Sequence, residues 1–440
     1  MMKTKKLKLS LVVMLVLSLL LAACSGDKTT GDNAKGKGDK IKLSIWHNYA
    51  GDDLRAKAVR KQIDQFEKEH PEVELDKQAI PVDGYRQRLK TVAAANEMPD
   101  VFYSYSGSFT EEFYKGNLIQ PVSDLWEKKP DWAEKFLPGS KEIFTYDNEV
   151  YSAPVGMSAT SFLYYNRDLF EKYNVKVPTT WDELMEAIKV FNKNKITPIA
   201  LGNKATWPAQ SSVFGVIADH VTGTEWFMKA IKSDGATFND PQFIEALNYF
   251  KDLVDAKAFQ EGANSIDNTQ AEQYFVKGNA AMMINGSWAI TNLAASSNKE
   301  ELDKIEVTVV PSIEGGKGKP NTMTGGPGGG FLMSSKVKDK KRELALELMY
   351  AISGPEAQKA IAESESLVMY DVDIDESKVS SLYNKAYELV KTVNFAPVYD
   401  LYLSSAGGEA INQGLQELML GGKPKEVAKK LQDAQSKAVK

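Results

Sequence analysis

The sequence predicts an α/β protein with two lobes, each containing a mainly parallel sheet flanked by helices. Three observations support this class. From residue 40 onward, segments with strand-like alternation and segments with helix-like spacing follow one another along the chain. A second cycle of the same kind begins near residue 151, and no low-complexity linker separates the two cycles. The 440 residues leave room for two or three domains of ordinary size.

The first cycle predicts the order strand, helix, strand, helix, strand. In residues 40–46 apolar residues alternate with polar ones, which is typical of a strand. Residues 54–69 carry apolar side chains at helical spacing, and Pro71 follows and stops the helix. The remaining elements are a strand, a helix and a buried strand, at residues 73–75, 85–95 and 100–105. This order favours parallel pairing of the three strands.

The second cycle has clear helix starts. Thr180-Trp181-Asp182-Glu183 is a capping box, in which the hydroxyl and the carboxylate accept the first N–H groups of a helix. Asp240-Pro241 opens another helix, with proline at its first turn. The other predicted elements are short strands at 162–166, 280–284 and 307–310, an apolar helix at 341–352 and an amphipathic helix at 425–438. No internal repeat of fixed period is present.

The first residues are predicted to be an export signal. Residues 1–23 begin with a cluster of lysines and continue as an apolar run too short to span a membrane as a helix. They end at Leu21-Ala22-Ala23-Cys24, which resembles the lipobox of bacterial lipoproteins and contains the single cysteine of the chain. We expect cleavage before Cys24, attachment of diacylglycerol (with acyl chains such as palmitate) to its thiol, and a flexible, solvated tether over residues 24–39. The alternative is an uncleaved anchor.

Composition and motifs exclude several classes of function. The formal charge of −5 becomes −9 when residues 1–23, with four lysines and no acid, are removed, and this acidity argues against nucleic-acid binding. One cysteine and three scattered histidines (His47, His70 and His220) give no metal motif. The sequence has no P-loop and no GxSxG nucleophile motif, and the glycine run at 325–330 does not fit a dinucleotide-binding loop. We therefore expect no cofactor and no metal, and the usual catalytic motifs are mostly missing.

Six stretches together resemble a known family. Their order and spacing over nearly the whole chain after Cys24 are similar to those of the extracellular solute-binding proteins (family 1) of carbohydrate ABC transporters, to which maltose-binding protein belongs. The stretches are Leu43–Asn48, Met98–Val101, Tyr165–Phe170, Pro178–Leu184, Gly278–Trp288 and Gly325–Gly330.

This resemblance implies a periplasmic-binding-protein-like fold with three crossovers between the lobes and a sugar bound in the cleft. The crossovers are expected near residues 151–159, 307–313 and 328–333, with the first lobe formed by 41–152 plus 311–328 and the second by 155–306 plus 332–440. The resemblance also implies a sugar or oligosaccharide ligand, ABC permease subunits as partners and a monomer held to the outer face of the cytoplasmic membrane by lipidated Cys24.

Sugar binding requires aromatic rings for the apolar faces of the pyranose and polar groups for its hydroxyls. The positions that the resemblance assigns to the ligand are His47, Asn48, Tyr49, Ser104, Tyr105, Ser106, Ser158, Trp207, Trp288, Gly326, Tyr399 and Tyr402. Trp46 and Trp181 are expected in the core instead. His47 could also be a surface residue, and Tyr399 and Tyr402, three residues apart, could pack one face of a helix.

Two other functions stay open at this point. A secreted lipoprotein hydrolase could use the same aromatic residues, but it would need a pair of carboxylates or a Ser-His pair at suitable separation. A receptor for a non-sugar solute could share the fold. Maltose-binding protein has charged residues at cleft positions where this chain has serines. We therefore expect an oligosaccharide other than maltodextrin at least as much as maltodextrin itself.

Overall fold

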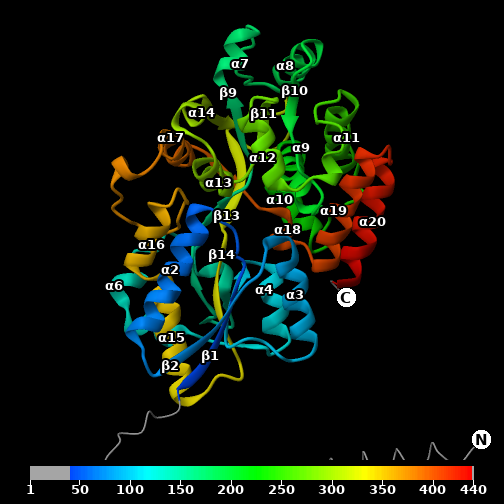
Figure 1. The fold of residues 1–440 in the computed structure, drawn as a ribbon. Helices are drawn as coiled ribbons and strands as arrows, with labels where there is room; N and C mark the ends of the chain where they lie inside the picture. Colours follow the sequence, from blue (N-terminus) through cyan, green and yellow to red (C-terminus); the bar gives the residue numbers. More distant parts are fainter. Residues whose placement is uncertain (1–39, 439–440) are drawn as a thin grey trace, which may run out of the picture. The chain divides into compact units, whose positions relative to one another are not determined.

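The computed structural model describes residues 40–438, and all of its helices and strands belong to one compact unit, Ile41–Lys440 (Figure 1). Predictions about residues 1–39, including Cys24, therefore lie outside the described residues. Two sheets organise the unit, and we call the parts built around them the first and the second lobe. A two-lobed α/β fold is what the sequence predicts.

The first sheet has the strand order β2-β1-β3-β14-β4, with β7 also paired to β14. Strand β1 runs parallel to both β2 and β3, which confirms the β-α-β-α-β order. Strand β14 enters from much later in the chain and pairs antiparallel with its neighbours. The bounds are β1 (Ile41–His47), β2 (Val73–Ala79), β3 (Val101–Tyr105), β4 (Ile119–Gln120), β7 (Ser152–Pro154) and β14 (Gly329–Ser334).

The second sheet has the order β10-β11-β9-β12. Only β10 and β11 are parallel, since β9 runs antiparallel to both of its neighbours, so this sheet is mixed rather than mainly parallel. Its strands are β9 (Phe162–Asn166), β10 (Thr197–Ala200), β11 (Ala280–Asn285) and β12 (Ile305–Val309). Smaller pairings involve β5 (Thr145–Tyr146), β6 (Glu149–Val150), β8 (Met157–Ala159), β13 (Thr322–Pro327) and β15 (Asn394–Ala396).

Helices cover both sheets. Those of the first lobe are α2 (Leu54–Glu69), α3 (Val82–Ala94), α4 (Ser108–Lys115), α5 (Ser123–Lys128), α6 (Pro130–Ala133), α15 (Asp339–Ser353) and α16 (Pro355–Ala362). Those of the second lobe are α7 (Arg167–Lys172), α8 (Trp181–Lys193), α9 (Gly215–Thr222), α10 (Thr224–Ala230), α11 (Pro241–Asp255), α12 (Asn268–Val276), α13 (Trp288–Ser296), α14 (Lys299–Asp303), α17 (Ser381–Val390), α18 (Tyr399–Tyr402), α19 (Ser405–Met419) and α20 (Pro424–Ala438). Short helices of other types are η1 (Glu142–Phe144), η2 (Ala209–Phe214), η3 (Ala263–Ser265) and η4 (Glu376–Lys378).

The helix starts follow from the sequence. Asp53 accepts the backbone N–H of Ala56 at the start of α2, and helix α8 begins at the predicted capping box of Thr180 and Glu183. Trp46 and Trp181 are buried in the cores of the first and second lobes, as predicted. These local signals place the helices that carry the residues discussed below.

The chain passes between the lobes three times, but at partly different places from those expected. It leaves the first sheet after β7, returns from β13 to β14, and leaves again after α16, whose Ile361 is still in the core of the first lobe. Residues 307–313 do not cross: β12 stays in the second sheet, and Ser312 bridges to Thr180 in the second lobe.

The expected lobe boundaries differ from the observed packing at β14, α15 and α16. We expected residues 332–440 in the second lobe, whereas Leu332, Met333, Leu348 and Met349 pack in the core of the first. The physical reason is that β14 completes the first sheet between β3 and β4, and α15 then covers it together with α2. Residues from α17 onward pack in the second lobe.

Candidate ligand-binding site

In the first lobe, the carboxyl ends of β1 and β3 bring four predicted residues together. Ile45 pairs with Val101, so the residues that follow these parallel strands meet at one edge of the sheet. Asn48 Nδ2 donates a hydrogen bond of 2.9 Å to the hydroxyl of Tyr105. His47 is 2% exposed and its ring centroid lies 5.9 Å from that of Tyr49.

The aromatic residues of this edge form a continuous cluster. Tyr103 contacts Tyr49 and Tyr105 edge to face, with ring centroids 5.3 and 5.4 Å apart. Two guanidinium groups lie over these rings: Arg55 at 5.4 Å from the Tyr49 centroid and Arg86 at 4.3 Å from that of Tyr105. Sequence reasoning singled out Tyr49 and Tyr105 but missed both arginines, because their positions depend on tertiary packing.

His47 is neutral at physiological pH. Burial lowers the pKa of His47, the positive charge of Arg60 acts in the same direction, and the resulting pKa is about 4. Burial also raises the pKa of Tyr49 to about 12, so its hydroxyl keeps its proton. His47 and Tyr49 are thus both uncharged hydrogen-bonding groups at this edge of the sheet.

The serines that follow β3 are engaged inside the protein. Ser104 Oγ lies 2.8 Å from Thr110 Oγ1, and Ser106 Oγ donates to the carbonyl of Pro327 over 2.7 Å. Both residues are fully buried. The hydroxyl of Ser106 therefore ties the end of β3 to the crossing strand β13. Ser158 lies opposite Gly326 in the antiparallel pairing of β8 with β13, so these two predicted residues belong to the crossover itself.

In the second lobe, Trp207 and Trp288 form an edge-to-face pair with ring centroids 5.4 Å apart. Trp288 begins α13, with two residues separating it from the end of β11, and Trp207 lies in the helical turn that leads into η2. The Trp288 ring lies on the backbone of Gly286, because a Cβ built on that glycine would come within 2.2 Å of the ring. Only glycine at 286 permits this position of the indole.

A buried carboxyl group lies behind Trp288. Glu272 of α12 accepts hydrogen bonds from the side-chain amides of Asn268, Asn285 and Asn292, at 2.7, 3.0 and 2.7 Å. Burial raises the pKa of Glu272 to about 8, against the opposing effect of these three donors. Sequence analysis missed Glu272, because its burial depends on packing against other elements and not on its neighbours in α12.

The two predicted tyrosines of α18 have different environments. Tyr399 is 1% exposed and stacks on Phe227 at 4.0 Å in the core of the second lobe. Tyr402 is 37% exposed and, with Tyr146 from the first lobe, lines a pocket of about 240 Å³. Packing on one helical face, the alternative that the sequence left open, describes Tyr399.

Direct contacts join the lobes beside these residues. Arg86 of α3 forms an ion pair of 3.0 Å with Asp400 of α18, and Ser108 Oγ donates to the Asp400 carbonyl over 3.4 Å. Trp207 Nε1 donates to Asp83 of α3 over 3.5 Å. Helix α13 also packs against α2. The predicted residues of the two lobes are thus held near one another.

Some polar atoms near these rings are buried and have no hydrogen-bond partner within residues 40–438. They include His47 Nδ1, Asn48 Oδ1, Arg55 Nε and Trp288 Nε1. Buried polar groups are nearly always hydrogen-bonded in folded proteins, and each exception calls for an explanation. A ligand that bonds these atoms would supply one.

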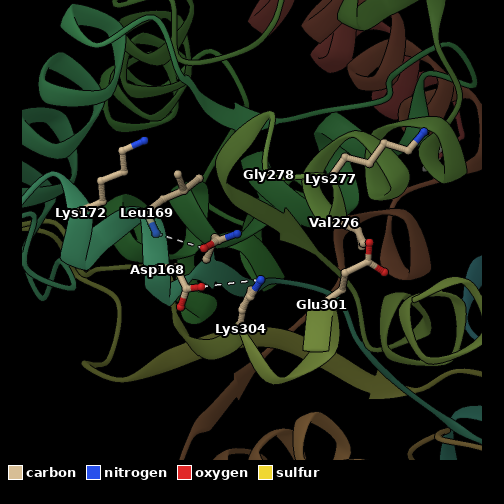
Figure 2. A pocket seen from close by; sticks show the side chains of 9 residues that line it. Asp168, Leu169, Lys172, Val276, Lys277, Gly278, Glu301 and Lys304 are labelled. Atoms are coloured by element: carbon tan, nitrogen blue, oxygen red, sulfur yellow. Dashed lines mark hydrogen bonds and ion pairs between the residues drawn. The ribbon is translucent and has the colours of Figure 1, made fainter. Parts of the chain in front are cut away.

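A second pocket lies in the second lobe, at the end of β9, and none of the predicted residues lines it. It has a volume of about 320 Å³ and is bordered by α7, α12 and α14, as Figure 2 shows. Asp168 and Lys304 face each other there at 3.9 Å. Among residues 40–438 no cluster of three or more His, Cys, Asp or Glu side chains could hold a metal, and no helix has the length and apolar character to cross a membrane.

Comparison with known proteins identifies relatives over most of the chain. The sequence profile of the family described as "Bacterial extracellular solute-binding protein" matches residues 51–359. A multiple sugar-binding protein from Streptococcus mutans is 25% identical over 377 residues, which cover 79% of this chain and 82% of that protein.

Solved structures agree with this result. A structure from a study of xylan utilization by Caldanaerobius polysaccharolyticus is 30% identical with a TM-score of 0.82, over 89% of this chain and 99% of that one. A chitin oligosaccharide binding protein superposes with a TM-score of 0.83 at 22% identity, over 90% and 99% of the two chains, and shows that the fold is shared.

Proposed function

Because the chain belongs to the family of bacterial extracellular solute-binding proteins, we propose that it captures a sugar or oligosaccharide between its lobes and delivers it to the permease of an ABC importer. Relatives described as binding sugars, such as the Streptococcus mutans protein, support carbohydrate as the ligand class. The family consists of binding proteins rather than enzymes, and in this role the chain releases its ligand chemically unchanged.

One observation carries the proposal: aromatic rings and unpartnered buried polar atoms occur together where the lobes meet. Trp207 and Trp288 offer indole faces that suit the C–H face of a pyranose. Trp288 Nε1 and Asn48 Oδ1 supply a free donor and a free acceptor for sugar hydroxyls. A site built for hydroxyls rejects analogues that lack them, because its own polar groups would stay unpaired.

We propose that six of the predicted residues contact the sugar: His47, Asn48, Tyr49, Tyr105, Trp207 and Trp288. Tyr402, Ser158 and Gly326 lie at the border of this group. In this proposal Ser104, Ser106 and Tyr399 support the site without touching the sugar, because their side chains contact other parts of the protein. The proposed lobes comprise residues 41–154 with 329–362, and residues 160–327 with 376–438.

Ligand binding and lobe closure are coupled in this proposal. A sugar that touches both lobes favours the closed arrangement by its difference in affinity for the two states. The contacts of Arg86 with Asp400 and of Trp207 with Asp83 favour the same arrangement in the absence of sugar. We expect an affinity on the order of micromolar, about 8 kcal/mol, which allows both capture and release.

We further propose that the protein acts as a monomeric lipoprotein. Cys24 would carry the lipid, residues 24–39 the tether, and the permease would receive the sugar at the outer face of the cytoplasmic membrane. Mass spectrometry of the membrane-bound protein tests the anchor, with Cys24→Ser as the control that should be released into the medium.

The test of binding uses the chain from Ser25 onward, which includes every element that the structure describes. Calorimetric titration with mono-, di- and trisaccharides should give one tight sugar class at 1:1 stoichiometry, and chromatography should recover that sugar intact. Recovery of cleaved sugar would favour the glycoside hydrolase instead. Binding of spermidine or phosphate, added as competitors, in place of every sugar would favour a receptor for another solute.

A further inference from the structure

Arg55 has no acceptor for its guanidinium group. It lies in the first turn of α2, its Nε is buried, and within the described residues it makes no hydrogen bond or ion pair. Its one specific contact is with the ring of Tyr49, at 5.4 Å from the centroid. The residue as a whole is half-buried, and the polar atoms of a guanidinium that are withdrawn from water are normally hydrogen-bonded.

The other arginines of the described chain show how unusual this is. Arg60 donates to the carbonyls of Tyr49 and Gly51, Arg86 pairs with Asp400, and Arg342 pairs with Asp124. The remaining two are exposed: Arg167 pairs with nearby acids, and Arg88 reaches solvent. Arg55 is therefore the one half-buried arginine in residues 40–438 without an acceptor.

Three acids around the proposed site already have other partners. Asp53 accepts the N–H of Ala56 as the cap of α2, and although its charge raises the pKa of Arg55, the two do not form an ion pair. Asp83 accepts from Trp207, and Asp400 is bound to Arg86. Asp53 thus stabilises the positive charge of Arg55 without a direct contact, and within residues 40–438 no acid forms an ion pair with Arg55.

The surroundings of Arg55 are those of the proposed sugar site. Asn48, with its free Oδ1, belongs to the same strand-end loop as Tyr49. Across the lobe boundary, α2 packs against α13, the helix that Trp288 begins. Together these features favour an anionic group on the ligand.

We infer that the ligand is an acidic sugar and that the guanidinium of Arg55 binds its carboxylate. This inference rests on the proposed function and names the class of sugar. The planar fork of a guanidinium matches a carboxylate with two parallel hydrogen bonds, whereas a neutral sugar offers no acceptor pair of this geometry. The carboxylate replaces the water that Arg55 loses when the lobes close, and the sugar ring lies against the tyrosine and tryptophan rings.

The experiment compares sugars that differ only in the carboxylate. Calorimetry on the chain from Ser25 onward uses D-glucuronate with D-glucose, D-galacturonate with D-galactose, and digalacturonate with galactobiose. At least one acid should bind tenfold or more tightly than its neutral partner. Arg55→Gln should weaken binding of that acid at least tenfold and change the affinity for the neutral partner less than threefold. Arg55→Lys should keep part of the preference, because it keeps the charge but loses the fork.

Arg88→Gln is the matched control, since Arg88 also lies over an aromatic ring, at 5.7 Å from Trp46, but is exposed. It should leave both affinities unchanged, and thermal unfolding should show that every variant folds. If a neutral sugar binds as tightly as its acid, or if Arg55→Gln weakens both equally, the acidic ligand is wrong while the sugar receptor stands. If no sugar of either kind binds, both proposals fail.

Discussion

Arg86 and Asp400 form an ion pair of 3.0 Å between helices that lie 314 residues apart in the sequence. Arg86 also covers the Tyr105 ring, so one guanidinium links the α18 carboxylate to the aromatic cluster of the first lobe. Because the pair joins the two lobes, its energy contributes to closure as well as to the stability of the fold.

We expect Asp400→Asn to weaken sugar binding three- to tenfold, since the closed arrangement loses a charge-assisted contact. Small-angle scattering of the unliganded variant should show a larger radius of gyration than that of the parent protein. A double-mutant cycle with Arg86→Gln should give a coupling of about 1–2 kcal/mol. Arg342→Gln is the control, because its pair with Asp124 lies within the first lobe. Equal scattering curves would show that the pair does not hold the lobes together.

Trp288→Ala and Trp207→Ala should each weaken sugar binding at least tenfold, which corresponds to about 1.4 kcal/mol, since each removes an aromatic face from the sugar. Calorimetry measures the change, and Trp288→Phe should retain part of the affinity. Trp181→Phe serves as the control, because Trp181 packs against Tyr249 in the core of the second lobe. A tryptophan variant that binds as the parent does would remove that residue from the proposed site.

Gly286→Ala should act through Trp288 without touching the ligand itself. The new Cβ would lie 2.2 Å from the indole ring, so the ring must move from its place. We expect a loss of affinity close to that of Trp288→Ala, together with a shift in tryptophan fluorescence. Gly84→Ala, in helix α3, has no atom within 4 Å of its new Cβ and should raise stability by about 0.5–1 kcal/mol with no change in binding. Unchanged fluorescence in Gly286→Ala would contradict the packing described here.

Glu272 should make the protein less stable as the pH rises toward 8. Burial raises the pKa of Glu272 to about 8 in the folded state, above its ordinary value of 4.5, so the folded state binds more protons between these limits. Stability from this group is complete below pH 4.5 and is lost as the pH passes 8. Burial lowers the pKa values of His47 and His220 to about 4, so they have the opposite effect, but only below pH 6.5.

The stability of the parent protein and of Glu272→Gln is therefore compared between pH 6.5 and 8.5, where His47 and His220 stay neutral. The free energy of unfolding of the parent protein, measured with urea, should decrease by on the order of 2 kcal/mol across this interval, as expected for a pKa raised by more than one unit. Glu272→Gln should remove most of that slope, whereas Glu300→Gln, an exposed residue, should keep it. If the stability of Glu272→Gln fell with pH as steeply as that of the parent protein, the titrating group would be a residue other than Glu272.

Local features of the fold could be predicted from the sequence, and long-range ones could not. The capping box at Thr180 and the apolar spacing of 54–69 depend on neighbouring residues, and both elements lie where expected. The direction of β9 and the insertion of β14 beside β3 depend on partners far away in the chain, so alternation alone does not reveal them.

The same distinction holds for the site. Trp288 and Asn48 follow strand ends, a place visible in the sequence, and both have unpartnered polar atoms beside aromatic residues in the structure. Arg55 and Glu272 look like ordinary helix-surface charges when read from the sequence alone. Their character depends on burial and on which partners they have, and only the folded chain supplies that information.

The position of β14 has a consequence for how the protein is made. Since β14 lies between β3 and β4, the sheet of the first lobe is incomplete until residue 334 has left the ribosome, and its core also requires α15 and α16. A nascent chain of 300 residues cannot yet form either the first lobe or its contacts with α18. The first lobe therefore cannot complete its native fold during most of the synthesis of the chain, which favours export of the chain before folding.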